Sequence, residues 1–105
     1  DVDNITFVQK QGNVVKAKVP DTWKETIYVW IWGDGIEDYE HVAKKQGDWY
    51  VFAYEGKELN IIFKNGEGWT GHPNQTEDIY TTRNACYILT QEGEEKAVAT
   101  EVDCQ

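Results

Sequence analysis

The chain has 105 residues, of which 19 are acidic and 10 are basic, giving a formal net charge of −9. Hydrophobic residues make up 40% and charged residues 28%, proportions typical of a folded globular domain and not of a disordered tail. The acidic balance argues against contact with nucleic acid or with an anionic membrane surface, because both need a basic patch on the protein. No segment approaches the ~18 consecutive apolar residues of a transmembrane helix.

A length of 105 residues fits one domain with one hydrophobic core. The sequence contains no methionine, even at position 1, so we expect residues 1–105 to be a single module excised from a larger multidomain protein. Aromatic residues make up 13% of the chain, more than so small a core has room to bury, so some rings are expected at the surface.

Short runs typical of strands recur along the chain between turn signals, whereas helical periodicity is almost absent. The predicted strands are Ile5–Gln9, Val14–Val19, Thr26–Trp32, Asp48–Tyr54, Leu59–Lys64, Ala85–Thr90 and Lys96–Val102. The one helix candidate, around Asp38 to Lys45, is too short to be stable alone. The pattern predicts an all-β fold, an immunoglobulin-like β-sandwich of about seven antiparallel strands. The last two strands are expected to form a hairpin across the turn at residues 92–95.

The predicted strand Thr26–Trp32 has two different faces, because successive side chains of a strand point to opposite sides. Its aliphatic residues share the face that suits the core: Ile27, Val29 and Ile31. Its aromatic residues share the outer face: Tyr28, Trp30 and Trp32. Either a neighbouring segment or domain covers these rings, or they form a platform for the flat apolar face of a sugar.

Polar candidates for the edge of such a platform lie in or beside the long irregular stretch Asn65–Asn84. The Gln75 amide both donates and accepts hydrogen bonds, as a sugar hydroxyl does. Lys64 is interpreted either as a donor to a hydroxyl or as a solvated charge. Trp69 lies among glycines without apolar neighbours, so nothing in the local sequence requires its ring to be buried.

The two cysteines, Cys86 and Cys104, leave two interpretations open: a disulfide near the C-terminus, or one buried thiol and one free thiol. No metal or cofactor is expected, because two cysteines cannot form a zinc site and the histidines His41 and His72 stand alone. No enzymatic activity is expected either. A retaining glycosidase needs two carboxylates roughly 5 Å apart in an enclosing cleft, and a sandwich this small lacks a deep cleft.

Four segments between about Pro20 and the C-terminus follow one another in a recognisable order. They are Tyr28-Val29-Trp30-Ile31-Trp32-Gly33-Asp34, Asp48-Trp49-Tyr50, Ile61-Ile62-Phe63-Lys64-Asn65-Gly66 and Gln75-Thr76-Glu77-Asp78-Ile79. This ordered set resembles a starch-binding module. It is similar to carbohydrate-binding module family 26 and to the starch-binding domains of Bacteroidetes starch-utilisation-system outer-surface lipoproteins. In this likeness Tyr39 replaces the family's platform tryptophan, and Gly71-His72-Pro73-Asn74 lengthens the loop before Gln75.

The resemblance implies a non-catalytic module that binds an α-1,4-glucan, such as starch or a maltooligosaccharide. It also implies an extracellular or bacterial cell-surface location and a link to a catalytic domain or to further binding modules. The site residues it implies are the platform pair Trp30 and Trp32, a further wall from Tyr39 or Trp69, and two side chains that hydrogen-bond the sugar 2- and 3-hydroxyls, Lys64 and Gln75. Two alternatives stay open: an immunoglobulin-like structural or interdomain module, and a binder of another polysaccharide.

Overall fold

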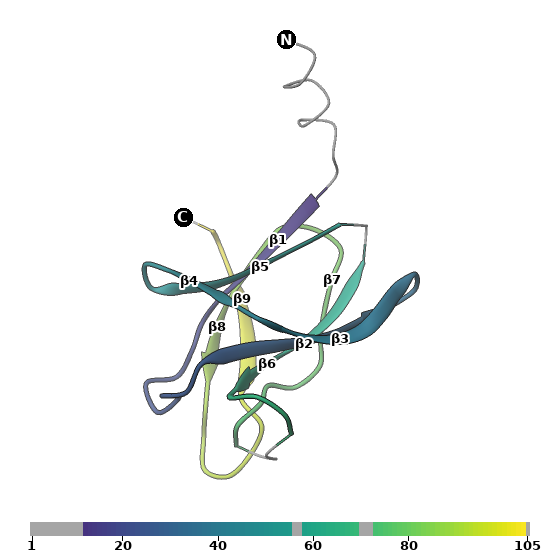
Figure 1. Ribbon diagram of the computed structural model, residues 1–105. Coiled ribbons are helices and arrows are strands. Elements are labelled where there is room, and N and C mark those ends of the chain that lie inside the picture. The colour runs from purple at the N-terminus through teal and green to yellow at the C-terminus, as the bar shows by residue number, and fades with distance from the viewer. Residues whose placement is uncertain (1–11, 56–57, 70–72, 105) are drawn as a thin grey trace.

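The computed structural model describes residues 12–55, 58–69 and 73–104. These residues form two β-sheets packed as a sandwich (Figure 1). The five-stranded sheet contains, in spatial order, β4 (Lys44–Gln46), β5 (Trp49–Glu55), β1 (Gly12–Lys18), β8 (Ala85–Thr90) and β9 (Val98–Val102). The four-stranded sheet contains β3 (Ile36–Val42), β2 (Ile27–Gly33), β6 (Leu59–Asn65) and β7 (Ile79–Thr81). Neighbouring strands are antiparallel except β1 and β8, which run parallel.

The predicted β-sandwich is confirmed, with nine strands among the described residues instead of about seven. Each predicted strand that lies within the described ranges is present, as β1, β2, β5, β6, β8 and β9. The predicted strand Ile5–Gln9 lies outside those ranges. The hairpin is confirmed as well, because β8 and β9 pair antiparallel and the Glu95 amide donates to the Glu92 carbonyl at 3.3 Å. This part of the chain contains no helix that could cross a membrane.

Three strands of the described part, β3, β4 and β7, are absent from the sequence prediction. The helix candidate at Asp38 to Lys45 is wrong, because these residues lie in β3 and β4 and between them. Strand β3 lies at the edge of its sheet, and its side chains are mostly exposed. Its sequence therefore shows no alternation of apolar and polar residues, which is the pattern by which the other strands were predicted. Strand β7 pairs with β6 through only three residues, within the stretch expected to be irregular.

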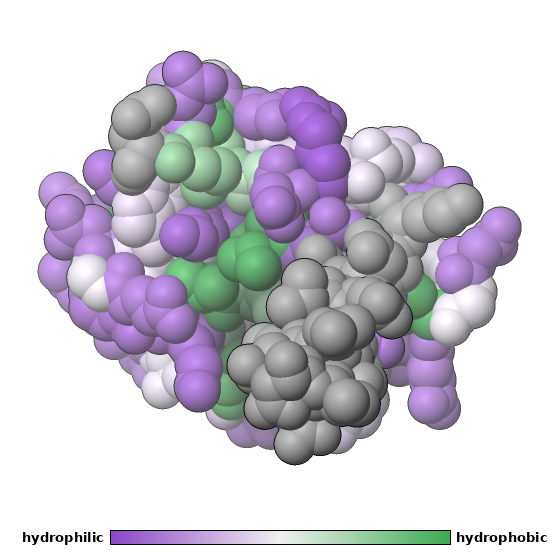
Figure 2. All heavy atoms as spheres, turned by 90° about the horizontal axis from the view of Figure 1, so that it is seen from above, coloured by the Kyte–Doolittle hydropathy of each residue, from purple (hydrophilic) through white to green (hydrophobic). Residues whose placement is uncertain are grey.

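The core lies between the two sheets, and β1, β2, β6 and β8 each supply it with alternate residues. The aliphatic residues Ile27, Val29 and Ile31 of β2 are buried in it, whereas the aromatic residues between them are only partly buried, so the two predicted faces of this strand are confirmed. Trp23 and Phe63 also belong to the core. Where Figure 2 shows the described residues, hydrophilic side chains surround a group of hydrophobic ones near the middle of the view.

Cys86 and Cys104 form a disulfide, with their Cα atoms 5.4 Å apart. Cys86 lies on β8 and Cys104 follows β9, so the bond joins the chain after the C-terminal strand to the neighbouring strand of the same sheet. Of the two interpretations left open by the sequence, the structure therefore selects the disulfide. No free cysteine is present in the described part of the chain.

Candidate functional site

The outer face of the four-stranded sheet brings together most of the predicted site residues. Side chains directly opposite each other on antiparallel strands lie on the same face. The pairing registers give three rows across the outer face: Val42, Tyr28, Lys64 and Gln75; Glu40, Trp30 and Ile62; Trp32, Asn60 and Tyr80. We call these residues, together with Trp69, the aromatic face.

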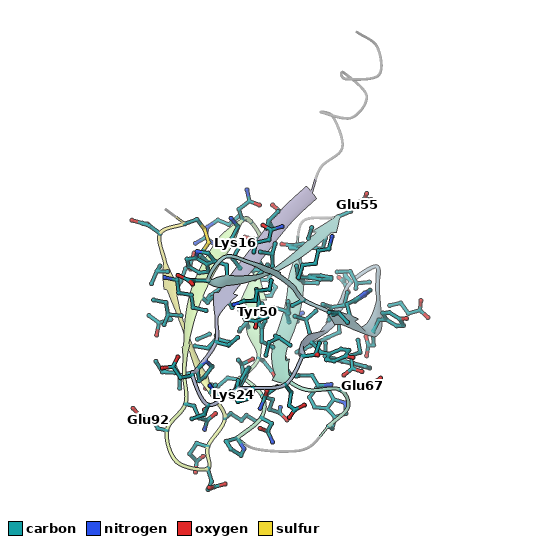
Figure 3. All side chains as sticks on the ribbon, turned by 60° about the vertical axis from the view of Figure 1, so that its left-hand side comes forward. Lys16, Lys24, Tyr50, Glu55, Glu67 and Glu92 are labelled. Carbon is teal, nitrogen blue, oxygen red and sulfur yellow. A yellow bond between two sulfur atoms is a disulfide. The ribbon has the colours of Figure 1, made fainter. Side chains whose placement is uncertain are left out.

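Trp69 lies in the loop after β6 and contacts Trp30. The two ring centroids are 5.7 Å apart and the ring planes are inclined at 64°, an edge-to-face arrangement that is favourable for aromatic pairs. Ile62 lies outside the core cluster and yet is only 7% exposed, so side chains of the aromatic face cover it. In Figure 3 the loop residue Glu67 lies on the opposite side of the molecule from Glu92 in the β8–β9 turn. The contact between Trp69 and Trp30 places the loop on the outer side of the four-stranded sheet.

Lys64 is buried beneath this loop and is only 1% exposed. Its ammonium forms an ion pair with the Glu40 carboxylate and lies 4.2 Å from the centroid of the Trp69 ring. The same carboxylate oxygen accepts a hydrogen bond from the Gly68 amide at 2.9 Å. The expectation that Lys64 donates to a sugar hydroxyl is therefore corrected, as is its interpretation as a solvated charge. Its ammonium is already engaged inside the protein, where it supports Trp69.

Glu40 stays ionised because of these partners. Partial burial acts to raise the pKa of Glu40, but the hydrogen bonds from Lys64 and from the Gly68 amide, with the charge of Lys64, outweigh it. Together they hold the pKa of this carboxyl below its ordinary value of 4.5. The two charges at the centre of the aromatic face therefore neutralise each other at neutral pH.

Gln75 lies next to Lys64 in an antiparallel bridge, so its side chain is on the aromatic face. Backbone hydrogen bonds fix the segment: the Thr76 amide donates to the Phe63 carbonyl at 3.0 Å, and the Ala97 amide donates to the Gln75 carbonyl at 2.8 Å. The buried Thr76 hydroxyl accepts a hydrogen bond from the Phe63 amide at 3.1 Å. The longer loop before Gln75 therefore does not move this residue away from the predicted platform.

Tyr39 lies on the other face of the sheet. It pairs with Ile31, whose side chain is in the core, so the register directs Tyr39 away from Trp30. The residue is 57% exposed, and its ring contacts that of His41, with centroids 4.5 Å apart. The His41 ring in turn lies 5.2 Å, centroid to centroid, from Phe52 of the opposite sheet. Of the two candidates for a further wall beside the tryptophan platform, only Trp69 is in position.

Two residues that sequence reasoning missed extend the aromatic face. Asn60 pairs with Trp32 on one side and with Tyr80 on the other, so an amide lies between two aromatic side chains. Tyr80 is exposed. Desolvation by its neighbours and, as the smaller cause, the nearby Glu58 carboxylate raise the pKa of its hydroxyl. Tyr80 lies between two buried residues of β7, an alternation typical of a strand. With only three residues, however, β7 is too short for this alternation to be recognised in the sequence.

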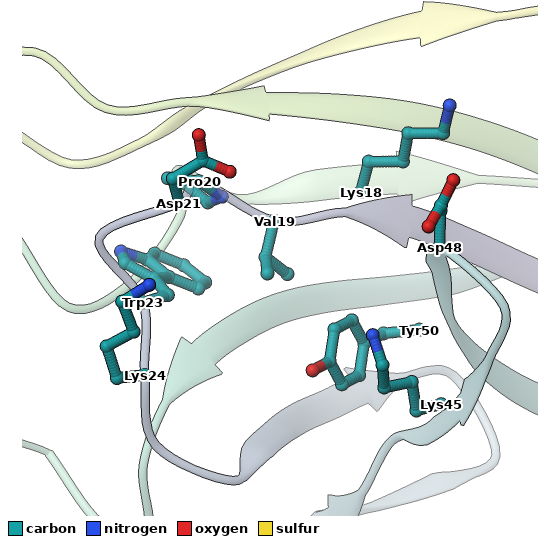
Figure 4. Close-up of a pocket in the computed structure, with 9 residues that line it drawn as sticks. All are labelled: Lys18, Val19, Pro20, Asp21, Trp23, Lys24, Lys45, Asp48 and Tyr50. Atoms are coloured by element: carbon teal, nitrogen blue, oxygen red, sulfur yellow. The ribbon is translucent and has the colours of Figure 1, made fainter.

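A hollow of about 370 Å³ lies away from the aromatic face. The residues that line it, shown in Figure 4, are Lys18, Val19, Pro20, Asp21, Trp23, Lys24, Lys45, Asp48 and Tyr50. Trp23 is only 6% exposed, so its ring serves the core and offers little surface for stacking. The Lys45 ammonium lies 5.3 Å from the centroid of the Tyr50 ring. The hollow is therefore rimmed by charges and lacks an accessible aromatic platform, and we do not assign the site to it.

The chemistry offered by the aromatic face is stacking and neutral hydrogen bonding. Among the described residues, no three His, Cys, Asp or Glu side chains are grouped so as to hold a metal ion. The second lone histidine, His72, lies outside the ranges that the structure describes. Comparisons of the chain with family models, with curated proteins and with solved structures found no match.

Proposed function

We propose that the protein is a non-catalytic carbohydrate-binding module whose aromatic face binds an α-1,4-glucan such as starch or a maltooligosaccharide. The observation that carries this proposal is the presence of Trp30, Trp32 and the half-exposed Trp69 on one face of one sheet. A group of accessible rings with a few polar neighbours is typical of a ligand-binding surface. The resemblance to starch-binding modules in the order of the sequence motifs supports the same ligand class.

The charges of the aromatic face favour a neutral ligand. Lys64 and Glu40 neutralise each other, which leaves the Asn60 and Gln75 amides as polar partners. Amides donate and accept hydrogen bonds, as sugar hydroxyls do. An anionic polysaccharide, by contrast, would approach a chain with a net charge of −9 and find the one cation of this face already paired.

The inclination of the rings favours a curved glucan over a flat one. The planes of Trp30 and Trp69 meet at 64°, so the two rings form a corner and not a level surface. A β-1,4-glucan is a flat ribbon and stacks best on coplanar rings. An α-1,4-glucan curves, so successive sugar units present their apolar faces at different angles, and a corner of two rings suits that shape.

The disulfide is in keeping with the proposed location outside the cytoplasm. Disulfides persist in oxidising environments, and Cys86 and Cys104 are joined in the folded domain. We propose an extracellular or cell-surface protein in which this module accompanies a catalytic domain or further binding modules. Several weak modules on one chain would then act together through avidity.

A second candidate function is an interdomain module whose aromatic face packs on a neighbouring domain. One observation favours it: Val42, an exposed aliphatic residue, lies at the edge of the aromatic face beside Tyr28. An aliphatic side chain adds apolar area for a protein partner but gives no ring for stacking on a sugar.

Affinity electrophoresis tests the two candidates. The protein is run in plain gels, in gels containing amylopectin and in gels containing hydroxyethylcellulose, beside its Trp32→Ala and Tyr39→Ala variants. We expect amylopectin alone to retard the wild type and the Tyr39→Ala control, whose substituted residue lies on the other face, but not Trp32→Ala. Equal mobility with and without amylopectin would contradict the glucan proposal and favour the interdomain module. Retardation by hydroxyethylcellulose alone would indicate a different polysaccharide.

A further inference from the structure

Trp69 is held in place by contacts from outside its own loop. The residues before it include Gly66 and Gly68, whose φ angles of 107° and 77° lie in a region that side chains other than glycine rarely adopt. Glycines at these positions allow the chain to turn but do not make it rigid. The position of the Trp69 ring therefore depends on the groups that the loop contacts.

Glu40 joins the groups that contact this loop. Its carboxylate oxygen accepts hydrogen bonds from the Lys64 ammonium on β6 and from the Gly68 amide, one residue before Trp69. Lys64 in turn places its ammonium 4.2 Å from the centroid of the Trp69 ring, within the range of a cation–π contact. Glu40 itself lies opposite Trp30 in the β2–β3 pair. One carboxylate thus fixes both the backbone before Trp69 and the cation against its ring.

Stability alone explains this arrangement poorly. The Lys64 ammonium is buried and the Glu40 carboxylate is partly buried, so both lose contact with water, and well-packed apolar side chains in the same place are often at least as stable. An apolar pair, however, would give the Gly68 amide no acceptor and the Trp69 ring no cation. The ion pair therefore supplies orientation that packing by itself would not.

We propose that Glu40 is the positioning residue of the site, holding Trp69 edge to face against Trp30 through Lys64 and the Gly68 amide before any ligand arrives. The inference rests on the proposed function, because it assigns Glu40 a role at the same aromatic face. Glu40 need not contact the glucan. A ring that is already in place costs less conformational entropy when the ligand binds, so the positioning contributes to affinity.

The test compares Glu40→Gln and the double variant Glu40→Ala/Lys64→Met with the wild type. Glu37→Gln is the matched control, since Glu37 is an exposed carboxylate on the same strand. The double variant removes both charges together, so neither remains buried without its partner. The first readout needs no ligand: far-ultraviolet circular dichroism of the exciton coupling between the Trp30 and Trp69 rings, identified by its loss in Trp69→Phe. The second is calorimetry with maltoheptaose.

We expect the exciton signal to weaken in Glu40→Gln, to vanish in the double variant and to stay unchanged in Glu37→Gln. Affinity should fall by roughly three- to tenfold in Glu40→Gln, the equivalent of one net hydrogen bond. An unchanged exciton signal in both Glu40 variants would overturn the positioning role, whether or not the glucan binds. An altered signal with unchanged affinity would overturn its contribution to binding. An altered signal in a protein that binds no glucan would support the positioning role and contradict the proposed function instead.

Discussion

The ammonium of Lys64 lies 4.2 Å from the centroid of the Trp69 ring, so a buried cation supports a tryptophan residue that is 52% exposed. A cation is attracted to the face of an indole ring by the negative potential of its π system. The Lys64 ammonium thus holds part of the Trp69 side chain, while about half of this residue remains in contact with solvent. A ligand that stacks on an aromatic ring needs that combination of support and access.

Trp32→Ala should abolish most glucan binding and leave the fold intact. Trp32 lies on the outer face of β2 and is only partly buried, so its removal leaves no cavity in the core. The loss of unfolding free energy should be well below the roughly 3–5 kcal/mol of a fully buried tryptophan. Trp23→Ala supplies the comparison, because Trp23 belongs to the core and should lose the full amount. Urea unfolding of both variants would contradict the assignment if their losses were equal.

The two faces of β2 could be predicted from the sequence because alternation is a local property. Successive side chains of one strand point to opposite sides whatever their partners are, so Trp30 and Trp32 had to share a face. The face on which Gln75 lies could not be predicted in this way, because it depends on a bridge to Lys64 from beyond a long loop.

The rest of the site depends on pairings that a single sequence does not specify. Tyr39 faces away from Trp30 because of the β2–β3 register. Counted from the turn between these strands, the register shifts by one residue between Gly33 and Ile31, so Tyr39 pairs with Ile31 and not with Trp30. A shift of one residue reverses the face of every side chain that follows it. Lys64 pairs with Glu40, which comes from an edge strand that the sequence pattern did not predict. The burial of Lys64 could therefore not be predicted either. Local patterns therefore predicted which aromatic side chains of β2 share a face, while the contacts that support Trp69 required the three-dimensional structure.

Glucan affinity should fall at acidic pH through Glu40. Its folded pKa lies below the ordinary value of 4.5, so its contribution is fully present above that value and is lost as the pH falls through the folded pKa. Protonation weakens the interaction with Lys64, which faces Glu40 from β6. The other groups that face it, the Gly68 amide in the loop and Trp30 on β2, do not titrate in this range.

Calorimetry with maltoheptaose from about pH 7 to about pH 3 checks this pH dependence, with Glu40→Gln measured in parallel. The wild type should lose affinity as the pH falls below the ordinary carboxyl range. The glutamine variant should start weaker and change little, because its amide does not titrate. Parallel curves for the two proteins would show that another group is responsible.

Thr76→Val should destabilise the protein more than Thr76→Ser does. The Thr76 hydroxyl is buried and accepts a hydrogen bond from the Phe63 amide at 3.1 Å. Valine keeps the shape but leaves that amide without this acceptor, at a cost of about 1–3 kcal/mol. Serine keeps the oxygen and loses one methyl group, worth about 0.8 kcal/mol. Denaturant unfolding of the three proteins should give that order of stability, and a valine variant as stable as the wild type would contradict it.

Removing the disulfide should lower the unfolding free energy by about 3 kcal/mol, the value for a loop of roughly 15 residues. Cys86 and Cys104 are 18 positions apart, so the bridge closes a loop of similar size. Urea unfolding of Cys86→Ala/Cys104→Ala and of the wild type measures the difference. The bridge lies on the five-stranded sheet, so affinity for maltoheptaose should stay unchanged below the unfolding transition. A loss of affinity in the folded variant would mean that the two sheets are coupled.

Gln75→Ala should weaken glucan binding by about three- to tenfold without abolishing it, because a hydrogen bond contributes about 0.5–1.5 kcal/mol net. The backbone at Gln75 is fixed by the Ala97 amide, which donates to its carbonyl at 2.8 Å, so the substitution removes only the side-chain amide beside Lys64. Gln46→Ala, an exposed glutamine on the other sheet, is the matched control. Calorimetry should place Gln75→Ala between this control and Trp32→Ala. An unchanged affinity for Gln75→Ala would mean that stacking suffices and that other groups hold the sugar hydroxyls.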